Sequence, residues 1–389
     1  MKKANSIIVI FLLIMAGCSE GKQSSDDIII VDVTKNYSSK QELILQDFMD
    51  VEYIVLETND DFLTQGSVRA IGKNFILVTN YNRVRDGNIY VYDKTGKAIR
   101  VINHLGQGAE EYSNIMEIIL DEDNNEIYVH NHYEKKIQVY DLYGKFKRSL
   151  HYKENLIGSF GFYTDILNYD KDNLICFDKF NENKAFVLIS KQDGNITKKI
   201  KISSKDTKIL WQINPSNNLP ADPGYYRSII TFKGNFILLE HSSDTIYTFL
   251  PDYSLCPFIV RTPSIQSMDP EIMLVLRLFS DRYYFMEAIK NIYDFDKRKG
   301  FPRTFIMYDK QKKAFGGYTV YNGDYSIKKE IYMNMITPAN HEIESWLPLE
   351  ASQLVEAYKN MELKGRLKEI AATLDEEDNP VIMLIKHKK

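Results

Sequence analysis

The stretch that decides the fold is Asn88–Gly96, NIYVYDKTG, which returns in similar form as Lys136–Gly144, KIQVYDLYG. Each copy is a short run rich in β-branched and aromatic residues that ends in an Asp-x-x-Gly turn, and a second such run follows the turn. Runs of this composition are typical of β-strands, and the glycine supplies the positive φ angle that a tight hairpin turn requires. The repeated unit is therefore a β-hairpin.

The hairpin recurs at a nearly constant interval along the chain. The turn glycines Gly96, Gly144 and Gly194 are 48 and 50 residues apart, and two more degenerate copies, with turns near Asp252 and Gln311, follow at intervals just under 60. Blades of kelch-type propellers take about 50 residues, so this spacing predicts four-stranded blades packed around an axis. A plain β-sandwich would not repeat one hairpin at near-constant spacing.

The two ends of the chain provide the strands for one further blade. Val51–Glu57 is strand-like, and Val381–Ile385 is a continuous apolar run of the kind that a strand buried on both faces shows. Joining these two strands in one sheet closes the ring and removes its exposed edges. We therefore predict an all-β fold, a six-bladed β-propeller formed by residues 28–389 as a single domain.

Two helices are expected to interrupt the strands. Asp269-Pro270-Glu271 has the form of an N-cap followed by proline at the first helical position, which predicts a short inserted helix over Ile272–Ser280. A second helix is predicted from about Glu350 to Leu374, where apolar residues step by three and four and Gly365 is a candidate kink. We expect the second helix to pack on the rim of the propeller, and a cofactor or partner groove is the alternative.

The first residues have the order of an export signal. Lys2 and Lys3 precede the apolar run Ile7–Met15, which is shorter than the roughly 20 residues that span a bilayer and has the length of a signal-peptide core. Small residues then lead to Cys18, as in the bacterial lipobox, in which the cysteine is acylated. We expect residues 1–17 to be a lipoprotein signal peptide and 18–27 a flexible tether. An ordinary secretory signal with a chance cysteine is the alternative.

The N-terminal lipid on Cys18 is then the contact with the membrane. Ser19 follows the cysteine, where inner-membrane retention would require aspartate, so the outer membrane is the expected location. The side of that membrane on which the domain lies is open.

Composition excludes several classes of protein. The chain has 389 residues with 44% hydrophobic residues, which is too apolar for a disordered protein. Its 49 basic and 53 acidic residues give a net charge of −4, so no basic field is available for nucleic acid. Three cysteines exclude a disulfide scaffold and a cysteine-based zinc cluster. Whether Cys176 and Cys256 form a disulfide or pack as free thiols is left open.

Four segments together carry a family resemblance. They are the lipobox, Val51–Glu57, Gly106–Tyr112 and Asn379–Met383, and in this order they resemble a family of six-bladed β-propeller lipoproteins of the cell envelope, NHL/TolB-like in architecture. The most specific motif is a Gly-x-Gly-Pro-Gly-Glu-Tyr loop between the first two blades. Its Gly106, Gly108, Glu111 and Tyr112 are present, whereas Ala109 and Glu110 replace Pro-Gly. The resemblance implies the fold and the location, and it implies no activity or catalytic residue.

The candidate ligand-binding residues lie in loops between strands. Trp211, Tyr225 and Tyr226 could stack on sugar rings while Arg227 fixes a polar group, and the alternative is that Trp211 and Tyr225 pack between blades. Arg83 lies in a polar loop that could present arginine to an anionic ligand.

His130 and His132 point to the same side of an extended segment and could begin a zinc site. No third ligand is visible in the sequence, and hydrogen-bonded imidazoles near a strand end are the preferred interpretation. We therefore predict no metal and no cofactor.

The function expected from these features is binding. The propeller is predicted to be an envelope-anchored interaction module for a glycan, a peptide or a protein partner. The alternative is a hydrolase or lyase that acts on extracytoplasmic polymers with residues at the mouth of the central channel.

Overall fold

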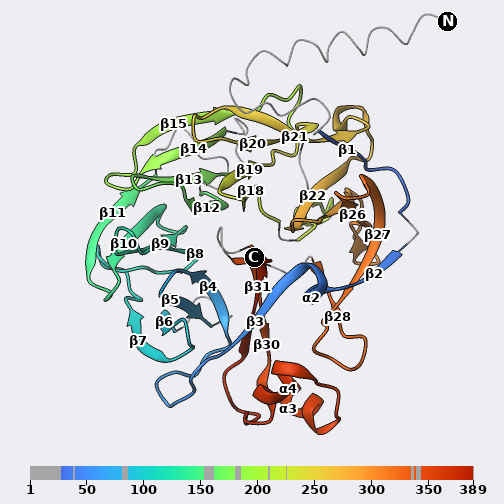
Figure 1. The fold of residues 1–389 in the computed structure, drawn as a ribbon. Helices are drawn as coiled ribbons and strands as arrows, with labels where there is room; N and C mark the ends of the chain where they lie inside the picture. Colours follow the sequence, from blue (N-terminus) through green and yellow to red (C-terminus); the bar gives the residue numbers. More distant parts are fainter. Residues whose placement is uncertain are drawn as a thin grey trace, which may run out of the picture.

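The computed structural model describes residues 28–37, 40–80, 86–152, 162–179, 185–208, 211–224, 226–333, 337–338 and 343–388. Six sheets stand around a central axis, and each of them is one blade of a propeller (Figure 1). The predicted six-bladed β-propeller is therefore confirmed.

Blades 1 to 3 each have four antiparallel strands, which follow one another from the axis outward. Blade 1 is β4 (Ser67–Ile71), β5 (Phe75–Thr79), β6 (Asn88–Asp93) and β7 (Ala98–Asn103). Blade 2 is β8 (Glu117–Asp121), β9 (Glu126–Asn131), β10 (Lys136–Asp141) and β11 (Phe146–His151). Blade 3 is β12 (Asp165–Asn168), β13 (Asn173–Phe177), β14 (Ala185–Ser190) and β15 (Ile196–Lys201).

Blades 4 to 6 also contain strands from the start of the chain. Blade 4 is β18 (Ile229–Phe232), β19 (Asn235–Leu238), β20 (Thr245–Phe249) and β21 (Leu255–Thr262), with β1 (Ile29–Asp32) outside. Blade 5 is β22 (Ile272–Phe279), β23 (Tyr283–Lys290), β26 (Arg303–Asp309) and β27 (Ala314–Tyr321), with β2 (Lys40–Ile44) and β28 (Glu330–Ile331) paired to β27. Blade 6 is β29 (Thr337–Pro338), β30 (Ile343–Leu349), β31 (Val381–His387) and β3 (Met49–Val55).

The ring closes as predicted, because the N-terminal strand β3 pairs with the C-terminal strand β31. The two strands are antiparallel, and their register runs from Met49 opposite His387 to Val55 opposite Val381. All of Val381–Ile385 is buried, which explains why this segment is apolar at every position.

The N-terminal segment extends over three blades before the ring closes, a path that was not predicted from the sequence. β1 pairs in parallel with β21 of blade 4, and β2 pairs in parallel with β27 of blade 5. A four-residue helix, α2 (Leu45–Phe48), then leads into β3 of blade 6. The sequence of β2, KQELI, has no apolar alternation because this strand lies outermost and stays largely exposed.

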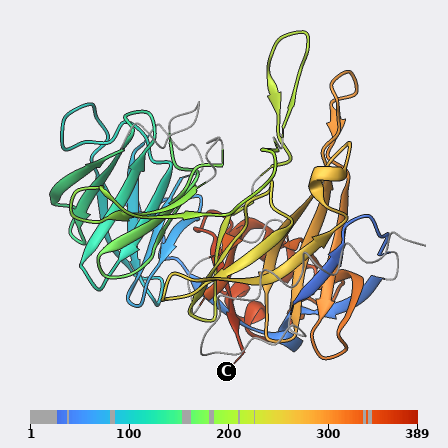
Figure 2. The same cartoon turned by 90° about the horizontal axis from the view of Figure 1, so that it is seen from above.

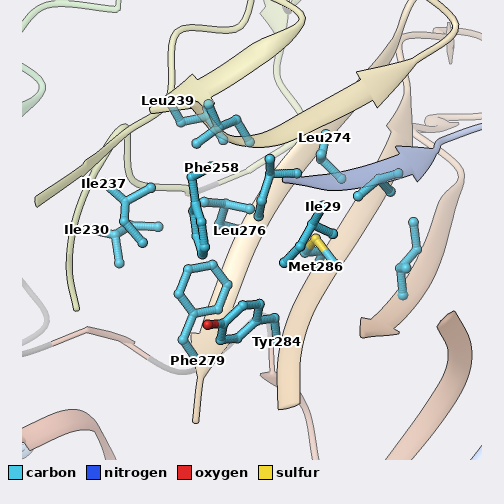
Figure 3. Packing of buried hydrophobic residues seen from close by; sticks show 14 of the residues in the cluster. Ile29, Ile230, Ile237, Leu239, Phe258, Leu274, Leu276, Phe279, Tyr284 and Met286 are labelled. Carbon is cyan, nitrogen blue, oxygen red and sulfur yellow. The ribbon is translucent and has the colours of Figure 1, made fainter. Parts of the chain in front are cut away.

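A hydrophobic cluster fills each of the six spaces between neighbouring blades. Figure 3 shows the cluster between blades 4 and 5, in which Ile29 of β1 packs with Ile237, Leu274 and Met286. Turn glycines connect one blade to the next. Gly96 has a φ of +88°, and its carbonyl oxygen accepts a hydrogen bond of 2.8 Å from the backbone N–H of Glu57.

The predicted helix over Ile272–Ser280 is wrong. The segment is the innermost strand of blade 5, β22, and seven of its eight residues are buried. Asp269-Pro270 satisfies the local rule for a helix start, but an apolar run interrupted by one arginine also fits a strand that packs against blades on both sides. Tertiary packing decides between the two.

The predicted C-terminal helix is divided into two. α3 (Ala351–Lys359) and α4 (Gly365–Ala371) are separated by a turn, and Gly365 has a φ of +56°. Both helices pack on Tyr325, Leu349 and Val381 at the outside of the ring (Figure 1). The two helices thus lie on the rim, where one helix was expected. α3 already ends at Lys359 and Gly365 is the first residue of α4, so Gly365 does not kink a continuous helix.

Cys176 and Cys256 are both buried, and they do not form a disulfide with each other. They lie in β13 of blade 3 and β21 of blade 4, and Cys176 packs in the cluster between blades 2 and 3. No helix in the described part of the chain is long and apolar enough to span a membrane.

Candidate functional site

The innermost strands of four blades line an open cavity of about 320 Å³ near the axis of the ring. We call it the central cavity. It follows the whole of β8, from Glu117 at one end to Glu122 and Asp123 in the turn at the other. Its remaining walls come from β4, β12 and β18 together with Trp346 of β30 and Arg227, which precedes β18. Its volume falls at the lower end of the range for ligand pockets, so it fits a small ligand or one end of a longer one.

An ion pair lies at one end of the central cavity. Arg227 donates from Nη2 to Oε1 of Glu117 over 3.1 Å, and both side chains are largely but not fully buried. Arg69 on β4 lines the same cavity, and its Nε donates to Oγ1 of Thr79 over 2.9 Å. Guanidinium and carboxylate groups in a partly desolvated site form strong, directional hydrogen bonds with polar ligands.

Asp165, the first residue of β12, adds a buried carboxylate beside this ion pair. It accepts hydrogen bonds from the backbone N–H of Ser228 (3.3 Å) and from the hydroxyl of Thr164 (3.2 Å). Burial raises the pKa of Asp165 to about 6, while the positive charge of Arg227 acts in the opposite direction. Through its bond to Ser228, the neighbour of Arg227, Asp165 fixes where β18 begins.

The opposite end of the central cavity is formed by turns. Glu122 accepts hydrogen bonds from the backbone N–H groups of Asn74 (2.9 Å) and Phe75 (3.0 Å), and so joins the turns of blades 1 and 2. Lys73 forms an exposed ion pair with Asp123 at 2.9 Å. The charges at this end are thus used to fasten one blade to the next.

Of the predicted ligand-binding residues in the described part of the chain, Arg227 lines the central cavity. Trp211 is half-buried in the segment that leads from blade 3 to blade 4. Tyr226 is buried, with its ring 4.5 Å from that of His241 and Nζ of Lys179 5.0 Å above it. Tyr226 therefore packs in the interior and does not line the central cavity. Cys18, Arg83 and Tyr225 lie outside the described residues.

His130 and His132 lie between blades 2 and 3 and do not line the central cavity, although His130 stands opposite Glu117 in the pairing of β8 with β9. Their rings are 6.5 Å apart, and His130 also faces the ring of Tyr152 at 5.8 Å. Burial lowers the pKa of His130 to about 3, so its imidazole is neutral at physiological pH. Within the described residues, no group of three His, Cys, Asp or Glu side chains is arranged to hold a metal ion.

The loop motif Gly106–Tyr112 connects blade 1 to blade 2. Glu111 accepts a hydrogen bond of 2.8 Å from the backbone N–H of Gly108, and a Cβ at Gly106 would collide with the same carboxylate. Tyr112 is fully buried and donates from its hydroxyl to the carbonyl oxygen of Gly87 over 2.6 Å. These contacts give the four motif residues a structural role in joining two blades.

Sequence reasoning missed Arg69, Glu117 and Asp165. The signal that could have found them is a charged residue inside or at the start of a short apolar strand, as in SVRAI, EIILD and DILN. Charged side chains are rarely buried without a partner, so such positions on innermost strands indicate a polar lining of the channel.

Comparison with known families identifies the family of this chain. Residues 28–386 match the family described as Domain of unknown function (DUF4934). The chain belongs to this family. A search of curated proteins finds no match.

Solved structures share the fold of this DUF4934 chain. A protein of Bacteroides fragilis that is thought to be exported is 16% identical with a TM-score of 0.56, and the match covers 93% of this chain and 99% of that one. A member of the DUF4221 family from Bacteroides vulgatus is 9% identical with a TM-score of 0.46, covering 88% and 99%. At 16% identity, the likeness to the Bacteroides fragilis protein shows the fold alone.

Proposed function

We propose that the protein is an exported, lipid-anchored binding module that takes a segment of a glycan into its central cavity. The observation that carries this proposal is the ion pair of Arg227 and Glu117, which lines the cavity with a donor and an acceptor 3.1 Å apart. Sugar hydroxyls both donate and accept hydrogen bonds, so a site that offers both roles suits them.

The walls of the central cavity support the same class of ligand. Trp346 is half-buried and lines the cavity together with Ile119 and Ile166. An aromatic face beside polar groups is the combination that binds the apolar face and the hydroxyl edge of a sugar ring. A peptide or protein partner, and turnover of the ligand by a hydrolase or lyase, are outcomes that the experiment separates.

The location in the envelope is supported by the N-terminal sequence. The apolar run Ile7–Met15 and the small residues before Cys18 have the order of a lipoprotein signal, and a structural neighbour is thought to be exported. We infer that Cys18 carries the lipid anchor in the outer membrane. Mass spectrometry of the protein from membranes should show acylated Cys18 as the first residue, and Cys18→Ala should abolish the modification.

The binding proposal is tested by calorimetric titration with a panel of oligosaccharides and peptides. An oligosaccharide should bind saturably, and Arg227→Gln should weaken it roughly tenfold to a hundredfold, because a charge-assisted hydrogen bond contributes about 1.5–3 kcal/mol. Arg366→Gln is the matched control, since Arg366 forms an exposed ion pair with Glu369 on α4. Binding of peptides alone would refute the glycan, and product formation would establish the enzyme.

A further inference from the structure

A second cavity lies beside the central cavity, in the space between blades 3 and 4. It has a volume of about 190 Å³, and its walls come from the turns β12–β13, β18–β19 and β20–β21 and from the adjoining strand ends. We call it the aromatic pocket. Its turns lie at the end of the ring that faces away from two projecting hairpins (Figure 2), which are β16 (Gln212–Ile213) with β17 (Pro220–Ala221) and β24 (Tyr293–Asp294) with β25 (Lys299–Gly300).

Four aromatic rings line the aromatic pocket. The ring centre of Tyr169 lies 5.2 Å from that of Phe236 and 5.7 Å from that of Phe249. The ring of Tyr253 is 6.5 Å from that of Tyr169, and the planes of these two rings differ by only 24°. Phe236 and Phe249 are buried, whereas Tyr253 is 42% exposed. Accessible aromatic faces of this kind can stack on the apolar face of a sugar ring.

Polar groups surround these rings. Asp170 and Asn235 line the aromatic pocket, and Asp170 is exposed. Its Oδ1 accepts hydrogen bonds from the backbone N–H groups of Asp172 (2.8 Å) and Asn173 (2.6 Å), which fixes the position of the carboxylate. A carboxylate has further lone pairs that can accept hydrogen bonds from hydroxyl groups. The pocket therefore combines aromatic faces with fixed polar groups, as sites for sugars do.

The two neighbouring interfaces are joined by ion pairs at this end of the ring. Nζ of Lys191 lies 2.5 Å from Oδ2 of Asp121 between blades 2 and 3, and Lys233 forms an ion pair with Asp281 between blades 4 and 5. Between blades 3 and 4 the aromatic rings take the place of such charges. Joining two blades here does not require aromatic residues, and rings that border a cavity indicate a binding role.

The central cavity and the aromatic pocket are adjacent, because Tyr169 belongs to the walls of both. Thr231 of β18 lines the central cavity, and Gly234, in the turn that follows this strand, lines the aromatic pocket. From Glu117 the central cavity follows the five residues of β8, which span roughly 13–17 Å, toward this same end of the ring. A ligand that occupies both cavities is therefore longer than a single sugar.

We propose that the protein binds a linear glycan of several sugars, which runs from Arg227 and Glu117 along the central cavity and across Tyr169 into the aromatic pocket. The inference rests on the glycan binding proposed above and extends it from a short segment to a chain. One sugar of the chain stacks on the ring of Tyr253, and Asp170 accepts hydrogen bonds from its hydroxyl groups. The affinity then increases with chain length until the aromatic pocket is filled.

The test is a calorimetric titration with cello-, xylo- and chito-oligosaccharides of two to eight sugars. The affinity should rise with length, and Tyr253→Ala should lower it about tenfold for the longest chains, because one stacking face is lost. The shortest oligosaccharide that binds occupies the central cavity, so Tyr253→Ala should leave its affinity unchanged, which also shows that the variant is folded. Tyr253→Phe keeps the ring and should bind every length as the original chain does.

Tyr143→Ala is the matched control. Tyr143 lies in the turn β10–β11 of blade 2, which corresponds to the turn β20–β21, and its side chain is 78% exposed. Cations lie over both rings, with Cζ of Arg100 4.5 Å from the ring centre of Tyr143 and Nζ of Lys198 4.3 Å from that of Tyr253. Tyr143→Ala should leave the affinity for every oligosaccharide unchanged.

Three results would overturn the inference. An affinity that does not rise with length, or one that Tyr253→Ala and Tyr143→Ala change equally, removes the aromatic pocket from the binding site. In both cases, weaker binding by Arg227→Gln would still support the central cavity as a glycan site. If none of the oligosaccharides binds, the glycan proposal fails and this inference fails with it.

Discussion

Gly96→Ala should loosen the closure between blade 6 and blade 1. Gly96 lies in the turn between β6 and β7 with a φ of +88°, where an L-residue is strained. A Cβ at this position would collide with the backbone carbonyl oxygen of Val55 and would lie 2.9 Å from Cγ2 of Ile54. The substitution therefore pushes the end of β3 away from the turn that holds it.

The magnitude follows from three contributions. The left-handed conformation costs an L-residue about 1–2 kcal/mol. Losing the hydrogen bond from Glu57 to Gly96 adds about 1 kcal/mol, and separating well-packed side chains such as Ile54 adds about 1 kcal/mol or more. Gly96→Ala should thus lower the free energy of unfolding by roughly 3–4 kcal/mol.

The chain offers a control for the conformational part alone. Gly234 has a φ of +77° in the turn between β18 and β19, and a Cβ there would meet nothing within 4 Å. Gly234→Ala should cost only about 1–2 kcal/mol. Urea denaturation followed by circular dichroism measures both variants, and equal losses would refute the idea that the turn of Gly96 fastens blade 6 to blade 1.

Two further predictions concern buried charges. The pKa of Asp165 is about 6 in the folded chain, whereas its ordinary value is 3.8, so the folded state binds the proton more tightly than the unfolded state does. The ionised carboxylate therefore lowers the stability of the fold above pH 6, and this loss disappears as the pH falls toward about 4. Asp165→Asn should therefore raise the thermal midpoint at pH 7.5 and leave it nearly unchanged at pH 4, and an equal rise at both values would contradict this sign. Lys191→Met should lower the free energy of unfolding by about 3–5 kcal/mol in urea titrations, because it leaves the carboxylate of Asp121, now 2.5 Å from Nζ of Lys191, buried without its cation. The added substitution Asp121→Asn should restore much of the loss, and no restoration would argue against the pair.

Most of the fold could be predicted from the sequence, because the repeated hairpin is recognised from residues that are neighbours in the chain. A few consecutive residues are enough to predict the turns at Gly96, Gly144 and Gly194 and the buried strand Val381–Ile385. β22 could not be distinguished from a helix, because Asp269-Pro270 obeys a local rule and only packing between two neighbouring blades overrides it. β2 was missed because a strand added to an outer edge needs no apolar alternation. β1 does alternate buried and exposed residues, but it lies outside the repeated hairpins.

The site was harder to predict than the fold. Arg227 was predicted from the composition of its loop, yet its partner Glu117 lies 110 positions earlier in the chain and meets it only when blades 2 to 4 assemble around the axis. Trp211 was predicted for the same reason and lies in the segment that leads from blade 3 to blade 4. Contacts across the axis join strands of different blades, and no local pattern encodes which of them meet.

The path of the N-terminal segment has a consequence for the order in which the protein can fold. β1, β2 and β3 pair with β21, β27 and β31, so the first strands of the chain find every one of their partners among the later blades. Blades 1 to 3 can assemble as they emerge, whereas β1 waits for β21, β2 waits for β27, and β3 has no partner until Val381–His387 has arrived. During that interval unpaired apolar strands are open to aggregation or to a chaperone, and completion of the ring is a single late event that depends on the whole chain being present.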